Sequence, residues 1–265
     1  MRLTRQQVIA YRVAAQGLMR DGSSADKLAV LDIGVQDTAG SAALALDARL
    51  AKPTPVPQSL ALAWTLRGAP HLHWRRDLDR LAAALYPLSD ADALARVDAS
   101  AGMRKAGIAG LDGFRIAVDA LRRIVTAPTG KGAASAALTR ATPDGMHRYC
   151  RSCRATHVFE MVLRLPTLAA GIELEPDTAP PVLVPRKGAA MPDGPDVAAL
   201  QALVRAYLTC SVRARTPTSP TIWGSVAPTS LRCGPTIWSR SASRAVAGGC
   251  PARRRLPSGG DASRD

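Results

Sequence analysis

Aromatic residues are scarce in this chain of 265 residues, which has two Phe, four Tyr and four Trp. Hydrophobic residues still make up 47% of the sequence, so the core must consist mainly of Leu, Ala and Val, a composition that suits helices. Long apolar runs are also missing, because the stretch at residues 60–64 falls far short of the ~20 residues of a membrane span. No apolar signal-peptide core follows the basic start. We therefore expect a cytoplasmic protein without a membrane partner.

Cysteine and acidic residues are few as well. The five Cys form an odd set, which does not indicate a disulfide framework. The chain has 21 Asp and Glu and 35 Lys and Arg, which gives a net charge of +14. This charge favours a polyanion partner, most simply nucleic acid. The charge is uneven: residues 210–265 contain nine Arg and two Asp, a net of +7, and the first 209 residues carry the other +7.

The last 56 residues differ from the rest in composition, and the tetrapeptide Pro-Thr-Ile-Trp occurs twice in them, at 220–223 and 235–238. One interpretation is a basic nucleic-acid arm. The other is a shifted reading frame. To test this, each codon of residues 217–224 is given G or C as its third base, and translation then starts from that third base. The result is Asp-Val-Ala-Asp-(Tyr or Asp)-Leu-Gly, which is an ordinary sequence for a folded protein. We favour a frameshift near Cys210, which makes 210–265 a disordered tail on a truncated chain.

The periodicity of apolar residues predicts a mostly helical chain. Thr4 and Gln7 fit a capping box at the first helix, and residues 112–126 carry an apolar helical stripe. A turn at 127–130 and an Ala-rich helix at 131–140 complete a helix-turn-helix pattern. Further predicted helices cover residues 41–50, 77–85, 90–102 and 196–208, and predicted strands cover 60–67, 158–163 and 172–175.

The two later strands would form a wing beside the helix-turn-helix pair. The predicted fold class is therefore mostly α with small β-hairpins, in tandem winged-helix units. Residues 1–110 form an N-terminal winged-helix-like region with a catalytic loop, and residues 111–195 form a second unit. A third unit starts at 196–209, before the tail at 210–265.

Several short segments resemble one protein family in their order and spacing. They are Leu-Thr-Arg-Gln-Gln-Val at residues 3–8, Gln36-Asp37, Arg67-Gly68-Ala69-Pro70-His71, Ala155-Thr156-His157-Val158 and Glu175-Pro176. Over residues 1–209 the chain resembles the AlkZ-like DNA glycosylase family. The resemblance implies winged-helix units around a cleft for duplex DNA. It also implies excision of alkylated purines or unhooking of interstrand crosslinks, although many relatives are known only as DNA-binding proteins.

The same resemblance implies a catalytic Gln-apolar-Gln motif, which reads Gly34-Val35-Gln36 here. An amide can hold a water molecule for attack on the sugar, and a positively charged alkylated purine leaves readily. Asp37 follows directly, and its carboxylate could stabilise an oxocarbenium-like centre. We therefore name Gln36 and Asp37 as catalytic candidates. In the alternative interpretation, both residues cap the next helix.

The predicted DNA contacts fall on two segments. Arg67, His71 and His73 belong to the family segment that the resemblance places near the DNA cleft. The others lie on the helix-turn-helix and are Arg122, Arg123, Lys131 and Arg140. The alternative for all of them is an ordinary solvated surface.

A metal site is suggested by His147-x2-Cys150-x2-Cys153-x3-His157, whose residue types and short spacing are compatible with zinc. The alternative is two reduced thiols with a structural His. No other cofactor is expected.

The sequence thus predicts a nucleoid-associated protein that binds double-stranded DNA, with monofunctional base excision as its candidate activity. The alternatives are a non-catalytic DNA-binding or regulatory protein, favoured by Gly34, and an inactive truncated product, favoured by the tail.

Overall fold

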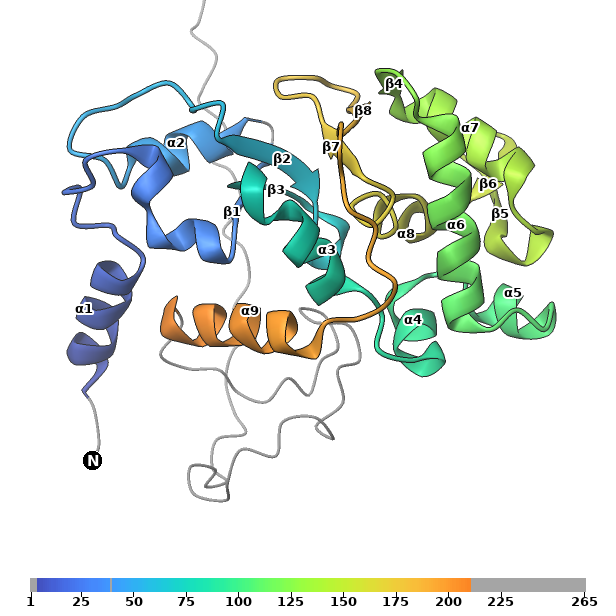
Figure 1. Cartoon of the computed structure of the whole chain (residues 1–265), viewed down its shortest axis with the longest axis horizontal. Helices are drawn as coiled ribbons and strands as arrows, with labels where there is room; N and C mark the ends of the chain where they lie inside the picture. The colour runs from blue at the N-terminus through green and yellow to red at the C-terminus, as the bar shows by residue number, and fades with distance from the viewer. Residues whose placement is uncertain (1–3, 39, 211–265) are drawn as a thin grey trace, which may run out of the picture. The chain divides into compact units, whose positions relative to one another are not determined.

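The computed structural model describes residues 4–38 and 40–210, all of which lie in the first of two compact units, Met1–Ala227 (Figure 1). The tail and the frameshift predicted near Cys210 lie outside the described residues, apart from Cys210 itself. About half of the described residues are helical, as the apolar periodicity predicted.

The β-structure is more extensive than the small hairpins predicted from the sequence. Six of them form one antiparallel sheet in the order β1-β3-β2-β7-β8-β4. Their bounds are β1 Val35–Gln36, β2 Leu60–Trp64, β3 Pro70–Trp74, β4 Thr129–Gly130, β7 Ile172–Leu174 and β8 Val182–Pro185. Every residue of β2 is buried, which is typical of a strand at the centre of a sheet.

The strand predicted at 172–175 is present as β7, but its assignment to a wing was wrong. Its Leu174 pairs with Leu62 of β2, and both side chains are buried. Because β7 pairs with β2, the segments predicted as the first and the second unit share one sheet. Residues 182–185, to which no strand was assigned from the sequence, form the next strand of the sheet.

Three α-helices lie within the first 85 residues, and the last described helix packs against two of them. Helix α1 spans Arg5–Ala15 and begins with the predicted capping box, in which Thr4 and Gln7 bond each other's backbone N–H. Helix α2 spans Ser41–Asp47 and α3 spans Leu78–Leu85. Helix α9, Val197–Cys210, packs along α3 (Figure 1). Short 3-10 turns are η1 Ala25–Lys27, η2 Ala29–Asp32, η3 Leu66–Gly68, η4 Arg75–Asp77 and η5 Asp144–Met146.

The helix predicted over residues 90–102 is divided into two. Helix α4 spans Asp90–Arg96 and α5 spans Ser100–Lys105. Val97 between them is extended, with φ −111° and ψ 141°. Arg96 donates a hydrogen bond back to the Leu85 carbonyl, which holds α4 against the end of α3.

The predicted helix-turn-helix pair is present as α6, Gly110–Ile124, and α7, Lys131–Ala141. A two-stranded hairpin follows, formed by β5, His147–Cys150, and β6, Ala155–Val158 (Figure 1). Residues 160–164, predicted as part of a strand, instead form α8, Glu160–Arg164. Within α8, Val162 and Leu163 are buried next to each other, whereas a strand with one buried face would bury alternate residues.

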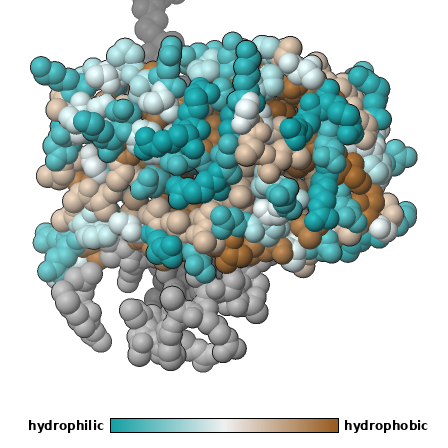
Figure 2. Space-filling view, in the orientation of Figure 1, coloured by the Kyte–Doolittle hydropathy of each residue, from teal (hydrophilic) through white to brown (hydrophobic). Residues whose placement is uncertain are grey.

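The largest hydrophobic cluster packs between one face of the sheet and α6, α7 and α8, and the opposite face is covered by α3 and α9. Figure 2 shows the face seen in Figure 1 as mostly hydrophilic, with hydrophobic patches separated by polar side chains. Among the described residues, no helix has the length and apolar character that a membrane crossing needs.

Candidate functional site

Gln36 lies on β1, the edge strand of the sheet. Its neighbour Val35 is buried opposite Leu72, whereas Gln36 is exposed and pairs with His71. The Gln36 Oε1 accepts a hydrogen bond from Arg67 Nη2 at 3.4 Å, and its Nε2 donates to Thr38 Oγ1 at 3.4 Å. The structure thus brings together two predicted site residues that are 31 positions apart, at an exposed position where the amide can meet a ligand.

Asp37 has a different role from its neighbour. Its Oδ1 accepts a hydrogen bond from the Ala42 backbone N–H at 2.9 Å, in the first turn of α2. Its own N–H donates to the Pro70 carbonyl at 2.8 Å, which extends the pairing of β1 with β3. The helix-capping interpretation therefore describes Asp37, while Gln36 makes no bond to the helix backbone. The catalytic assignment of Asp37 stays a prediction.

Arg67 occupies a strained turn between β2 and β3. Its backbone has φ 58° and ψ 23°, the left-handed region that few non-glycine residues adopt. The turn is closed by hydrogen bonds from Thr65 N to the Ala69 carbonyl and from Gly68 N to the Thr65 carbonyl, both at 3.0 Å. Gly68 has a φ of 64°, which favours glycine, and a Cβ there would lie 2.9 Å from Met161 Sδ, so the Met161 side chain would have to move. Such a closed turn holds the exposed Arg67 beside Gln36.

Arg164 of α8 contacts this turn through a hydrogen bond to its backbone. Its Nη1 donates to the Gly68 carbonyl at 3.0 Å, and its guanidinium lies 5.0 Å from the centre of the Trp64 ring. Glu160 accepts from Arg164 Nε at 2.5 Å and pairs with Lys131 Nζ at 2.6 Å. The predicted DNA contact Lys131 is therefore already paired with a carboxylate in this structure.

Burial of Glu160 alone would raise the pKa of its carboxyl group. The hydrogen bond from Lys131 and the positive charges of Arg164 and Lys131 outweigh this effect and lower the pKa below its ordinary value. Glu160 is therefore ionised at neutral pH and links the Arg67 turn to the first residue of α7.

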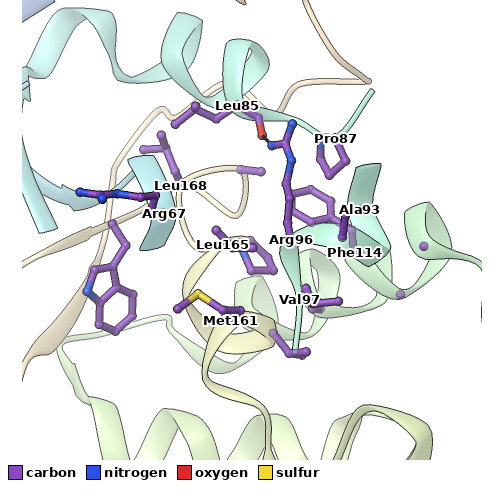
Figure 3. A pocket seen from close by; sticks show the side chains of 18 of the residues that line it. Arg67, Leu85, Pro87, Ala93, Arg96, Val97, Phe114, Met161, Leu165 and Leu168 are labelled. Carbon is purple, nitrogen blue, oxygen red and sulfur yellow. Dashed lines mark hydrogen bonds between the residues drawn. The ribbon is translucent and has the colours of Figure 1, made fainter. Parts of the chain in front are cut away.

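A largely apolar cavity of about 300 Å³ opens beside the Arg67 turn. Figure 3 shows Arg67 and Leu168 on one side of it and Arg96, Ala93 and Phe114 on the other. Arg96 is fixed there by Asp92 and by the Leu85 carbonyl. Volumes of this size are at the lower end for small-ligand sites.

His71 and His73 are buried on β3, with 5% and 3% of their surface exposed. The Ala69 carbonyl can only accept, so His71 Nδ1, 2.9 Å away, carries a proton. The Thr65 hydroxyl, 3.0 Å from that nitrogen, is then the donor to His73 Nε2 at 3.1 Å. Both rings are neutral members of one internal network. Neither ring is placed at the surface, and their DNA contacts stay predictions.

Gly34 faces His73 directly. A Cβ at this position would lie 2.3 Å from His73 Cε1, and the backbone φ is +82°. The imidazole therefore fills the space that a side chain on residue 34 would need. The glycine that interrupts the Gln-apolar-Gln pattern is thus required by a residue 39 positions later.

We expect stability to fall in mild acid because of His73. Burial, and secondarily the nearby His71, lower the pKa of His73 to about 3. An unfolded His has a pKa near 6.5, so below that pH the unfolded chain binds a proton that the folded chain does not. The stability is therefore fully present above about pH 6.5 and falls as pH decreases, by up to about 1.4 kcal/mol per pH unit.

Urea unfolding between about pH 7.5 and pH 5 measures this effect. The comparison is with His73→Asn, whose side chain does not titrate, and the value at pH 7.5 removes the constant cost of the substitution. The wild-type curve is expected to fall more steeply than that of the variant. Parallel curves for the two proteins would show that His73 is not the responsible group.

The other predicted DNA-binding residues lie on α6 and α7. Arg122 and Arg123 are exposed near the end of α6, and Arg140 is exposed near the end of α7. Among the described residues, the side-chain hydrogen bonds of Gln36 and Arg67 involve none of these three arginines, and their DNA contacts stay predictions.

The structure brings three of the four predicted metal ligands together. The ligand atoms of Cys150, Cys153 and His157 all lie within 4.8 Å of one another. His147 is not among them, because its Nε2 lies 3.0 Å from Thr142 Oγ1 and its Nδ1 lies 3.4 Å from Asp144 Oδ1. Hydrogen bonds to Ser152, Cys153 and His157 lower the pKa of Cys150 to about 6.

The site around Gln36 and Arg67 also includes Thr65, Glu160 and Arg164, none of which was predicted from the sequence. Thr65 joins two histidines across a turn, and Arg164 reaches the Gly68 carbonyl from 96 residues away. No local pattern marks either residue. The segment at 67–71, which carried part of the family resemblance, pointed to this region but not to these residues.

The described fold and site define an α+β protein with an exposed amide–guanidinium pair at the edge of its sheet. Among solved structures, the chain is similar to the Streptomyces sahachiroi DNA glycosylase AlkZ, with 18% identity and a TM-score of 0.54. The similarity covers 80% of this chain and 58% of that chain, and at this identity it shows the fold alone. Among curated proteins, none matches.

The family model described as DNA glycosylase AlkZ-like matches residues 26–226, about three quarters of the sequence. The chain therefore belongs to the AlkZ-like DNA glycosylase family. The match begins later than the resemblance drawn from residues 1–209, and it continues beyond Cys210, where the frameshift is predicted.

Proposed function

We propose that this protein binds duplex DNA at the surface around Gln36 and Arg67 and excises an alkylated purine there. The observation that carries the proposal is the Gln36–Arg67 contact of 3.4 Å, exposed on the edge of the sheet in a chain of this family. The chain spans 58% of the solved AlkZ chain, so activity and substrate are inferred from the site and the family together.

Each of the two residues has a suitable chemical role. The Gln36 amide offers a carbonyl acceptor and N–H donors, with which it can hold a water molecule for attack on the sugar carbon. An amide is no general base, so the reaction depends on a leaving group that is already positively charged, such as an alkylated purine. Arg67, held by its closed turn, supplies a guanidinium for a DNA phosphate.

The helix-turn-helix pair extends this DNA surface in our proposal. Helices α6 and α7, followed by the β5–β6 hairpin, have the element order of a winged helix, with the hairpin as the wing. The exposed Arg122, Arg123 and Arg140 would then contact phosphates. In this proposal the wing is the β5–β6 hairpin, and it is no longer the pair of strands predicted at 158–163 and 172–175.

A second candidate function is DNA binding without base excision. Gly34 stands where the family motif has its first Gln, and the His73 ring fills the space. Only one amide of the pair is available, so the site could recognise DNA without positioning water precisely enough for reaction. The third hypothesis, an inactive truncated product, depends on residues outside the described part of the chain.

Base release from duplex DNA that carries 7-methylguanine separates these functions. We expect the full chain to release the base, and Gln36→Ala to lower the single-turnover rate by about 10- to 100-fold, because the water loses its positioning group. DNA binding is measured alongside by fluorescence anisotropy at several salt concentrations. Gln36→Ala is expected to retain the wild-type affinity.

Gln201→Ala serves as the matched control, because Gln201 is an exposed glutamine of α9, away from the edge strand. Salt-sensitive binding without base release would favour the binding protein over the glycosylase. If the folded chain shows no DNA binding and no base release, both functions are contradicted. Equal rates for wild type and Gln36→Ala would refute the assigned role of Gln36.

A further inference from the structure

We propose that Cys150, Cys153 and His157 bind a zinc ion at the tip of the β5–β6 hairpin. Their three ligand atoms lie within 4.8 Å of one another. Around tetrahedral zinc, with bonds of about 2.0–2.3 Å, ligand atoms are ~3.5 Å apart, so the side chains must close by about 1 Å. Such a shift is within reach of rotamer changes at an exposed turn.

The hairpin register explains why these residues meet. Cys150 is the last residue of β5 and pairs with Ala155, the first residue of β6. His157 follows Ala155 by two positions, so it projects on the same face as Cys150, as its diagonal neighbour. Cys153 lies in the four-residue turn between the strands, in which Arg154 takes a left-handed φ of 51°. The turn therefore brings the second thiol back towards the first.

The orientation of the His157 ring is that of a metal ligand. Its Nδ1 lies 2.7 Å from the Val158 carbonyl oxygen, which can only accept, so the proton is on Nδ1. Nε2 is then the nitrogen with a lone pair. Histidines that bind metals commonly donate their other N–H to a carbonyl group in this way, which fixes the tautomer and the ring. This observation is independent of the distances within the cluster.

His147 is excluded from the site by the same register. It pairs with Val158 and lies three positions before Cys150 on the same strand, so its side chain is on the opposite face of the hairpin. The four-ligand set predicted from the sequence is therefore reduced to three. A fourth position remains for water or for a group from a partner.

The donor set favours zinc among common cellular metals. Two thiolates and an imidazole are soft and borderline ligands, which suit zinc and disfavour magnesium and calcium. Cys150 and Cys153 are free thiols in the structure and offer both sulfurs to the ion.

The ion would tie the end of β5, the turn and β6 into one rigid tip. This tip carries the exposed residues Arg148, Arg151 and Arg154. Rigid placement of three guanidinium groups would favour contacts with DNA phosphates. This consequence rests on the proposed function, whereas the metal site does not.

Metal analysis of the full chain, purified under reducing conditions without DNA, tests the site. We expect about one zinc ion per chain, and a thiolate-to-metal charge-transfer band when cobalt replaces zinc. Cys153→Ser and His157→Asn are expected to weaken zinc binding by more than about 100-fold, measured by competition with a chelating indicator. Circular dichroism of each variant shows whether its fold is intact.

Two controls separate this site from other ligands. His147→Asn removes the histidine of the opposite face, and the double variant Cys233→Ser with Cys250→Ser removes two thiols from the tail. Both are expected to keep the metal. Absence of zinc and of the cobalt band in the wild-type chain would overturn the proposal, and so would unchanged binding in Cys153→Ser and His157→Asn. A Cys150–Cys153 disulfide that persists under reducing conditions would also overturn it.

Discussion

Gly34→Gln, the substitution that completes the family's motif, is expected to destabilise this protein by about 3 kcal/mol. Two costs combine. The backbone φ of +82° costs a non-glycine residue about 1–2 kcal/mol, and a Cβ only 2.3 Å from the His73 ring adds an overpacking cost of about 1–3 kcal/mol. Urea unfolding measures the loss. We expect no gain in base release, because the new amide displaces His73 from its network.

Two further variants separate the costs. Gly40 also has a positive φ, +79°, but a Cβ there would meet nothing within 4 Å, so Gly40→Ala is expected to lose only the backbone term. Combining Gly34→Gln with His73→Ala removes the colliding ring, and the double variant is expected to lose less stability than the sum of the single variants. Strictly additive losses would show that His73 does not set the requirement for glycine.

Asp92→Ala is expected to lower the free energy of unfolding by about 3–5 kcal/mol, because it leaves a buried guanidinium without its counter-charge. The Asp92 and Arg96 side chains are only 4% and 12% exposed, and their closest atoms lie 2.5 Å apart. Asp92 Oδ2 also accepts from the Leu88 N–H at 2.9 Å, which ties α4 to the end of α3. Chemical denaturation at neutral pH measures the loss.

The matched control is Asp112→Ala. Asp112 and Arg115 form an ion pair of the same residue types, at 3.6 Å, but with side chains that are 64% and 55% exposed. Water screens such pairs, so the expected loss is at most about 1 kcal/mol. Similar losses in the two variants would contradict the importance that we assign to burial. Because Arg96 lines the cavity beside Arg67, Asp92→Ala is also expected to alter that cavity.

The helices were predictable because the signals for them are local. The capping box at Thr4 and the apolar stripe of α6 depend on residues within one or two helical turns, and both appear in the structure as the sequence indicated. The break at Val97 was not predictable in this way. Next to the break, Arg96 donates to the Leu85 carbonyl, eleven positions back along the chain, and no periodic pattern records such a contact.

The site, too, was predictable only in part. The segments that hold Gln36 and Arg67 were identified from the sequence, but their contact arises from the pairing of β1 with β3 and from the closed turn after β2. Residue type alone could not distinguish the capping Asp37 from the exposed Gln36, since both interpretations suited both residues. In the structure, Gln36 ends the edge strand as an exposed residue, whereas the Asp37 carboxylate accepts from the Ala42 N–H of α2.

By itself, the sequence determined the helical character of this protein, its helix-turn-helix pair and its family, because each depends on patterns carried by neighbouring residues. The tertiary structure alone decided that Gly34 makes room for His73 and that the hairpin faces separate His147 from the cysteines. Strand register sets both outcomes. A shift by one residue reverses the face of every side chain, and the burial of distant strands against each other selects the register.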